Sequence, residues 1–193
     1  RMITNIEKMR SGIFLIAWGY IFIYFNININ AVSLLPAFVG YGLFLSAIGL
    51  LQDEERELSL LKPLVGILLV WNAADWVLSW MGSEAIETWF LLDLLTGLIN
   101  LYFQFQFLTN LASIAAKYQE PDRDCDTKLL TYRNWQTIML TIVILIGILQ
   151  LWLSEIWGYV SIGIGIVYIL FGICLIKTLF ELRNALRTDE SGL

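Results

Sequence analysis

The chain has 193 residues, of which 58% are hydrophobic and only 15% are charged, and its mean hydropathy is +0.71. Soluble domains are closer to half apolar and a quarter charged, so this composition places the chain in the integral membrane class. The net charge of −5 argues against a nucleic-acid partner, and the absence of histidine removes the commonest general base and a common ligand of zinc and haem. We therefore expect no metal site and no cofactor.

Six stretches of the chain approach or meet the length of about 20 mostly apolar residues that a bilayer-crossing helix needs. They predict an all-α fold, a polytopic membrane helix bundle that forms a single domain over residues 1–193. Pro36 and Pro63 are expected in the first turns of their helices, where a missing N–H costs least. The predicted spans are Ser11–Phe25, Ala31–Leu51, Pro63–Met81, Ile86–Ala116, Trp135–Leu153 and Tyr159–Lys177.

The basic residues predict the orientation of these spans. All 12 lysines and arginines lie before the first span, between the second and third, between the fourth and fifth, or at and after the end of the sixth. The three other connections, around residues 26–30, 82–85 and 154–158, contain none. Because basic loops stay in the cytoplasm, this bias predicts cytoplasmic N and C termini and three hairpins closed on the outer side.

The start of the second span carries a recognisable pattern, with Leu35 and Pro36 followed by Phe38, Gly40 and Tyr41. The segment 26–43 resembles a Leu-Pro-x-Phe-x-Gly-Tyr helix start in uncharacterised small multi-span membrane proteins of Gram-positive bacteria. The resemblance implies a bacterial cytoplasmic membrane and implies nothing about a substrate.

Two acidic segments lie in the predicted cytoplasmic connections. We interpret the cluster 53–57 as a solvated helix end, with the docking of a partner protein as the alternative. The segment 122–126 matches the first ligands of a calcium-binding hand. However, Thr127 replaces the glycine of the sixth position and Arg133 the glutamate of the twelfth. It is therefore predicted to be a solvated link.

Two carboxylates lie inside the predicted spans, where a charge costs a few kcal/mol unless it has a partner, a proton or water. Asp75 precedes the end of the third span by six residues, and Asp93 follows the start of the fourth by seven. At 1.5 Å per residue, both lie about 10 Å below the outer interface. A tight turn joins the two helices, so we expect the carboxylates at one depth in neighbouring helices.

Each aspartate also belongs to a stripe of polar residues with helical spacing. Asn72 and Asp75 share a face of the third span. Asp93, Thr96, Asn100 and Gln104 follow one face of the fourth at i, i+3, i+7 and i+11. Two interpretations stay open for these side chains. Buried polar groups can join helices by hydrogen bonds with no further role. Alternatively, they line a polar pocket in the outer half of the bundle.

Glycines recur on one face of the sixth span, at Gly158, Gly165 and Gly172. Such a smooth face allows a second helix to approach closely. We interpret it as packing within the bundle, with a homo-oligomer seam as the alternative. Gly40 predicts a similar close approach in the second span.

No catalytic residues are predicted. A rhomboid-type serine protease needs a histidine, and neither aspartate lies in the GxGD motif of intramembrane aspartyl proteases. The leading hypothesis is a small transporter or solute-binding membrane protein that binds a cation, a proton or an amine-bearing solute. The alternative is a non-catalytic scaffold or regulatory subunit that binds another membrane protein. The candidate ligand-binding residues are Asp75, Asp93, Asn72, Thr96, Asn100 and Gln104.

Overall fold

The computed structural model of the chain describes residues 2–25, 28–29, 32–33, 36–80, 90–149 and 157–186. The all-α prediction is confirmed in this part of the chain, which holds six α-helices, one short 3₁₀ helix and two strands of two residues each. The helices are α1 (Met2–Tyr24), α2 (Ala37–Leu51), η1 (Arg56–Leu61), α3 (Lys62–Trp80), α4 (Phe90–Tyr118), α5 (Cys125–Leu149) and α6 (Trp157–Ala185).

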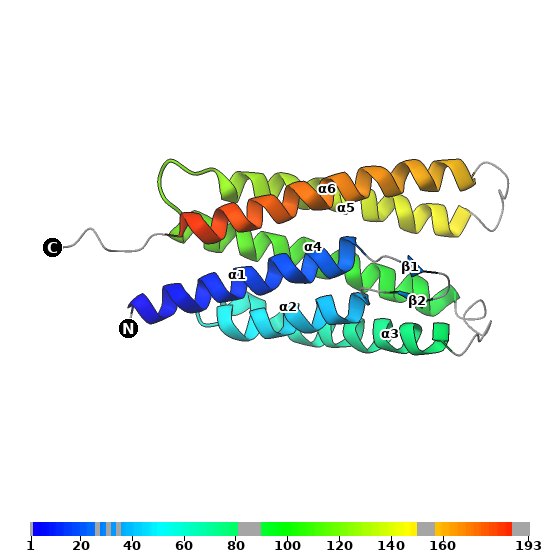
Figure 1. The fold of residues 1–193 in the computed structure, drawn as a ribbon, viewed down its shortest axis with the longest axis horizontal. Helices are drawn as coiled ribbons and strands as arrows, with labels where there is room; N and C mark the ends of the chain where they lie inside the picture. Colours follow the sequence, from blue (N-terminus) through cyan, green and yellow to red (C-terminus); the bar gives the residue numbers. More distant parts are fainter. Residues whose placement is uncertain are drawn as a thin grey trace.

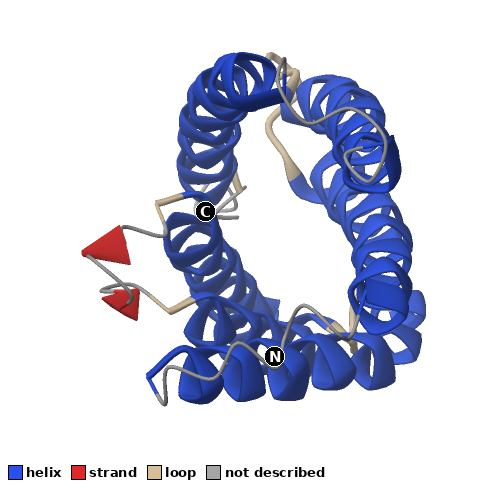
Figure 2. Cartoon of the chain, turned by 90° about the vertical axis from the view of Figure 1, so that its right-hand side faces the viewer, coloured by secondary structure: helices blue, strands red, loops and turns tan. Residues whose placement is uncertain are grey.

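The helices lie side by side along the long axis of the molecule, and α1 begins at the same end at which α6 finishes (Figure 1). Each helix contacts the next one in the chain, and α6 also contacts α1. Seen along the bundle, the six helices form a ring (Figure 2). Neighbours in sequence are therefore neighbours in space, and polar residues of α3 and α4 can meet.

Among the described residues, four helical segments are long and apolar enough to cross a membrane. The second α-helix is apolar but has only 15 residues, a length of about 22 Å against a hydrocarbon core of about 30 Å. The four segments are Arg56–Leu78, Leu91–Tyr118, Cys125–Leu149 and Ile162–Ala185.

The predicted start of the second span at Ala31 is wrong, because the helix begins at Ala37. Before it, β1 (Asn28–Ile29) and β2 (Val32–Ser33) form a short antiparallel pair. Pro36, expected in the first turns of this helix, instead directly precedes it with an extended backbone, φ −69° and ψ 131°. A proline also disfavours helical geometry in the residue before it, which explains why the apolar run does not continue the helix toward its N-terminal side.

Three helices extend beyond their predicted spans at the end of the bundle where α1 begins. The first starts at Met2, α5 starts at Cys125, and α6 continues to Ala185. Apolar residues of these extensions are buried in the main hydrophobic core, which stabilises the extra turns. They include Met9, Leu129, Leu179 and Leu182. The predicted span ends at Met81, Ile86 and Leu153 lie outside the described residues.

Close helix packing at glycines is confirmed at two positions. A Cβ atom added at Gly40 would lie 2.6 Å from the carbonyl oxygen of Gly19, so the backbones of α2 and α1 approach directly. A Cβ atom at Gly172 would clash with the ring of Tyr24. This glycine face of α6 thus packs within the bundle at Gly172, whereas Gly165 has no atom within 4 Å of such a Cβ position. The packing around Gly158 is not described.

The acidic cluster 53–57 is not only a solvated helix end, because three of its glutamates accept hydrogen bonds from neighbouring helices. Glu54 accepts from Asn5 at 2.9 Å and from the Tyr118 hydroxyl, so it links α1 to α4. The other two bonds also tie the connection between α2 and α3 to α4. They run from Ser113 to Glu55 at 3.0 Å and from Gln106 to Glu57 at 3.1 Å.

Candidate functional site

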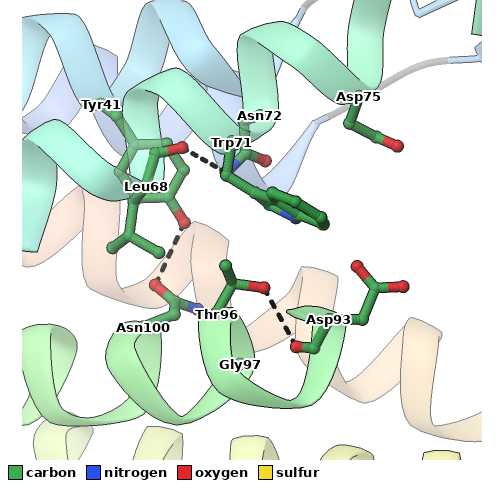
Figure 3. Close-up of a pocket in the computed structure, with 9 residues that line it drawn as sticks. All are labelled: Tyr41, Leu68, Trp71, Asn72, Asp75, Asp93, Thr96, Gly97 and Asn100. Atoms are coloured by element: carbon green, nitrogen blue, oxygen red, sulfur yellow. Dashed lines mark hydrogen bonds between the residues drawn. The ribbon is translucent and has the colours of Figure 1, made fainter. Parts of the chain in front are cut away.

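A pocket of about 420 Å³ lies between α2, α3 and α4 (Figure 3). Two of its lining residues, Asp75 near the end of α3 and Asp93 near the start of α4, belong to the end of the bundle opposite the start of α1 (Figure 1). The helical spacing of the polar residues explains its lining, since positions three, four and seven apart share a face. Nine residues line it: Tyr41, Leu68, Trp71, Asn72, Asp75, Asp93, Thr96, Gly97 and Asn100.

The structure brings five of the six candidate residues into this pocket. They are Asn72 and Asp75 from α3 together with Asp93, Thr96 and Asn100 from α4. The sixth, Gln104, is not part of the lining; it lies one turn further along α4 and is 2% exposed. Asp75 and Asp93 thus line one pocket from α3 and α4, which are neighbouring helices as the sequence analysis expected.

The inner boundary of the pocket is a hydrogen-bonded network of neutral side chains. The hydroxyl of Tyr41 donates to Asn100 Oδ1 at 3.1 Å, and Gln104 Nε2 donates to the same oxygen at 3.4 Å. The hydroxyl of Tyr20 donates to Gln104 Oε1 at 2.7 Å. This network joins α1 and α2 to α4, so its amides act as links between helices.

The two aspartates differ from the amides in having no such links. Both side chains are exposed, and they approach the same space from α3 and α4 (Figure 3). Among the described residues, no hydrogen bond or ion pair engages either carboxylate, and the recorded ion pairs all involve Arg123, Lys128 or Lys177. Interhelical bonding through Asp75 or Asp93 therefore has no support in the described contacts.

Four lining residues were not identified from the sequence. Trp71 lies four positions before Asp75, so the spacing alone could have placed its indole on the same face. Leu68 continues this face one turn earlier, and Gly97 follows Thr96 directly. Tyr41 comes from α2 and is 5% exposed; no spacing within α3 or α4 indicates that it reaches Asn100.

The acidic segment 122–126 engages neighbouring polar and charged side chains. Asp124 forms an ion pair with Lys128 at 3.0 Å, and this hydrogen bond lowers the pKa of the Asp124 carboxyl. Asp126 accepts from Gln119 Nε2 at 2.7 Å. Within the described ranges, no three His, Cys, Asp or Glu side chains are grouped as a metal ion would require.

Comparison of the chain with protein-family models, with curated proteins and with solved structures finds no significant match.

Proposed function

We propose that the chain is a six-span protein of a bacterial cytoplasmic membrane, arranged as three hairpins closed on the outer side. The proposal is supported by the placement of all 12 basic residues, since 11 lie in four of the seven segments outside the predicted spans and Lys177 ends the sixth span on the same side. In this orientation the pocket between α3 and α4 belongs to the outer half of the bundle. The four segments that are long and apolar enough to cross a membrane supply four of the six proposed spans. We propose α1 and α2 as the other two.

The pocket is proposed to bind a small solute, with Asp75 and Asp93 as the charged contacts and the amides as orienting groups. The protein then acts as a transporter or solute-binding membrane protein for a cation, a proton or an amine-bearing solute. One observation carries this proposal. Both aspartates line a pocket, yet no described residue bonds to their carboxylates. Uncompensated charge in an apolar setting is costly, and such residues serve function more often than packing.

The test is thermal stability in detergent from about pH 4 to about pH 9 for the parent protein and for Asp75→Asn and Asp93→Asn. We expect both variants to be at least as stable as the parent and to show a flatter dependence on pH. The reason is that an amide removes the cost of a charge that no described residue pairs, and the substitution deletes no bond to the described part of the chain. Asp53→Asn is the matched control, because Asp53 is exposed and lies outside the pocket.

Early melting of both pocket variants at every pH would contradict the proposal, because it would mean that the carboxylates hold the helices together. That result would favour the alternative function, a scaffold or regulatory subunit, and the next measurement would be co-purification of a partner membrane protein. If Asp53→Asn melts at the same temperature as the parent protein in this experiment, the loss of thermal stability is specific to the pocket variants.

A further inference from the structure

Three side chains of the pocket lining use a hydrogen-bond donor within the protein, whereas Asn100 Nδ2 donates in none of the hydrogen bonds of the described residues. Asn72 Nδ2 donates to the carbonyl oxygen of Leu68 at 2.7 Å. The hydroxyl of Thr96 donates within its own helix, and the hydroxyl of Tyr41 donates to Asn100. The oxygen atoms of these groups and of the two carboxylates remain as acceptors. A complementary ligand therefore supplies donors.

The charge of the pocket points in the same direction. Asp75 and Asp93 are its two ionisable carboxylates, and no lysine or arginine is among the nine lining residues. A ligand that carries a positive charge and N–H donors forms charge-assisted bonds with both carboxylates, and such bonds are roughly twice as strong as neutral ones. A protonated amine has both properties in one group.

The size and the aromatic side chains of the pocket favour an organic body over a bare ion. Its volume of about 420 Å³ lies in the range of small-molecule sites, roughly 300–1,000 Å³. Trp71 lies between α3 and α4 beside the aspartates (Figure 3). Tyr41 forms part of the opposite boundary, next to Asn100. Indole is the best aromatic partner for a cation and also stacks on planar rings.

We propose that the ligand is a protonated primary or secondary amine attached to an aromatic body. Its ammonium group donates to Asp75 and Asp93, and its ring contacts Trp71. This inference rests on the proposed function of the pocket. It narrows the proposed ligands from cations, protons and amine-bearing solutes to amines with an aromatic ring, in which the N–H donors and the ring have separate contacts.

The experiment is isothermal titration of the full chain in detergent with four probes near neutral pH. Tryptamine carries the ammonium group and the ring, whereas 3-ethylindole carries only the ring. Tetramethylammonium carries the charge without N–H donors, and manganese chloride supplies a metal cation alone. Thermal stability is recorded with each probe for the parent protein and for the variants below.

We expect tryptamine to bind the parent protein and the other three probes to bind at least about tenfold more weakly. Asp75→Asn and Asp93→Asn should each weaken tryptamine binding about 10-fold to 100-fold, since each removes a charge-assisted bond. Trp71→Leu should weaken it about tenfold, and Trp71→Phe less, because Phe keeps a ring. Trp135→Leu is the matched tryptophan control, since Trp135 is 57% exposed and lies outside the pocket.

The outcomes separate this inference from the proposed function. If manganese or protons stabilise the protein through the aspartates while tryptamine does not bind, the proposed amine ligand is wrong. The proposed function of the pocket as a binding site is then still supported. The amine proposal is also overturned if tetramethylammonium binds as tightly as tryptamine. The same holds if Asp75→Asn and Asp93→Asn leave tryptamine binding unchanged. If no probe acts through the aspartates and both variants melt early at every pH, the proposed function fails as well.

Discussion

Tyr20 and Gln104 form a buried pair on which the inner boundary of the pocket depends. The tyrosine is fully buried, the glutamine is 2% exposed, and their hydrogen bond measures 2.7 Å. Because Gln104 also donates to Asn100, this pair connects the core of α1 to a residue of the pocket lining. A buried acceptor that loses its donor keeps the full cost of its desolvation.

We predict that Tyr20→Phe lowers the free energy of unfolding by about 1–3 kcal/mol, because it leaves Gln104 Oε1 without its buried donor. Tyr102→Phe is the matched control. Tyr102 is 59% exposed, and its substitution should change stability by less than about 0.5 kcal/mol. Unfolding by sodium dodecyl sulfate, followed by circular dichroism, measures both. Equal effects of the two substitutions would refute the structural role of the Tyr20 bond.

At the residue scale, spacing along one helix was enough to predict which polar side chains share a face. This is how five of the nine lining residues were identified. The partners that come from other helices, Tyr20 and Tyr41, could not be predicted in this way. Each is a tyrosine within an apolar helix, and its hydroxyl finds Gln104 or Asn100 only after the helices pack.

At the scale of elements, the contact between α1 and α2 depends on the absence of side chains at two glycines. Gly19 and Gly40 face one another, and Phe44 fills the space beside Gly19. Backbone-to-backbone contact of this kind brings two helices closer than larger residues permit. The same helix α2 supplies Tyr41 to the pocket, so its position relative to α1 also affects the site.

We predict that Gly40→Ala destabilises the protein by about 1–3 kcal/mol. The new methyl group would meet the Gly19 carbonyl oxygen at 2.6 Å, and a backbone atom cannot rotate away as a side chain can. Gly49→Ala on the same helix is the control, because no atom lies within 4 Å of its Cβ position. There alanine should stabilise by up to about 1 kcal/mol through its helix propensity. Opposite signs in thermal unfolding support the contact, and two stabilising substitutions would contradict it.

The helices themselves were predictable from runs of apolar residues, but their ends were not. Hydropathy marks the part of a helix that suits a bilayer and does not indicate how far the helix continues outside it. Leu129 and Leu182 prolong α5 and α6 because they pack in the shared core, which is a tertiary effect. At Pro36 the reverse occurred, since an apolar run suggested helix where the local backbone is extended.

At the scale of the whole molecule, the two ends of the bundle have different roles. The end where α1 starts and α6 finishes holds the apolar helix extensions, the hydrogen bonds of the acidic cluster 53–57 and the ion pairs of the described residues. The other end holds the pocket and the carboxylates of Asp75 and Asp93, which pair with none of the described residues. A tightly packed end thus supports a looser polar end, an arrangement suited to a site that exchanges a ligand with the outer solution in the proposed orientation.

The orientation itself gives the last prediction. All 12 basic residues fall in segments that a six-span topology puts on one side, and one span more or fewer would distribute them over both. We therefore expect a green fluorescent protein fused after Leu193 to fluoresce and an alkaline phosphatase fused there to be inactive. When the chain is cut within residues 82–85 and ends in the reporter, we expect the green fluorescent protein to be dark and the alkaline phosphatase to be active. An active phosphatase after Leu193 would place the C terminus outside and would require an odd number of spans or an inverted bundle. In an inverted bundle the pocket would open toward the cytoplasm. Tryptamine added to inside-out vesicles, whose cytoplasmic face is exposed, would then bind the pocket.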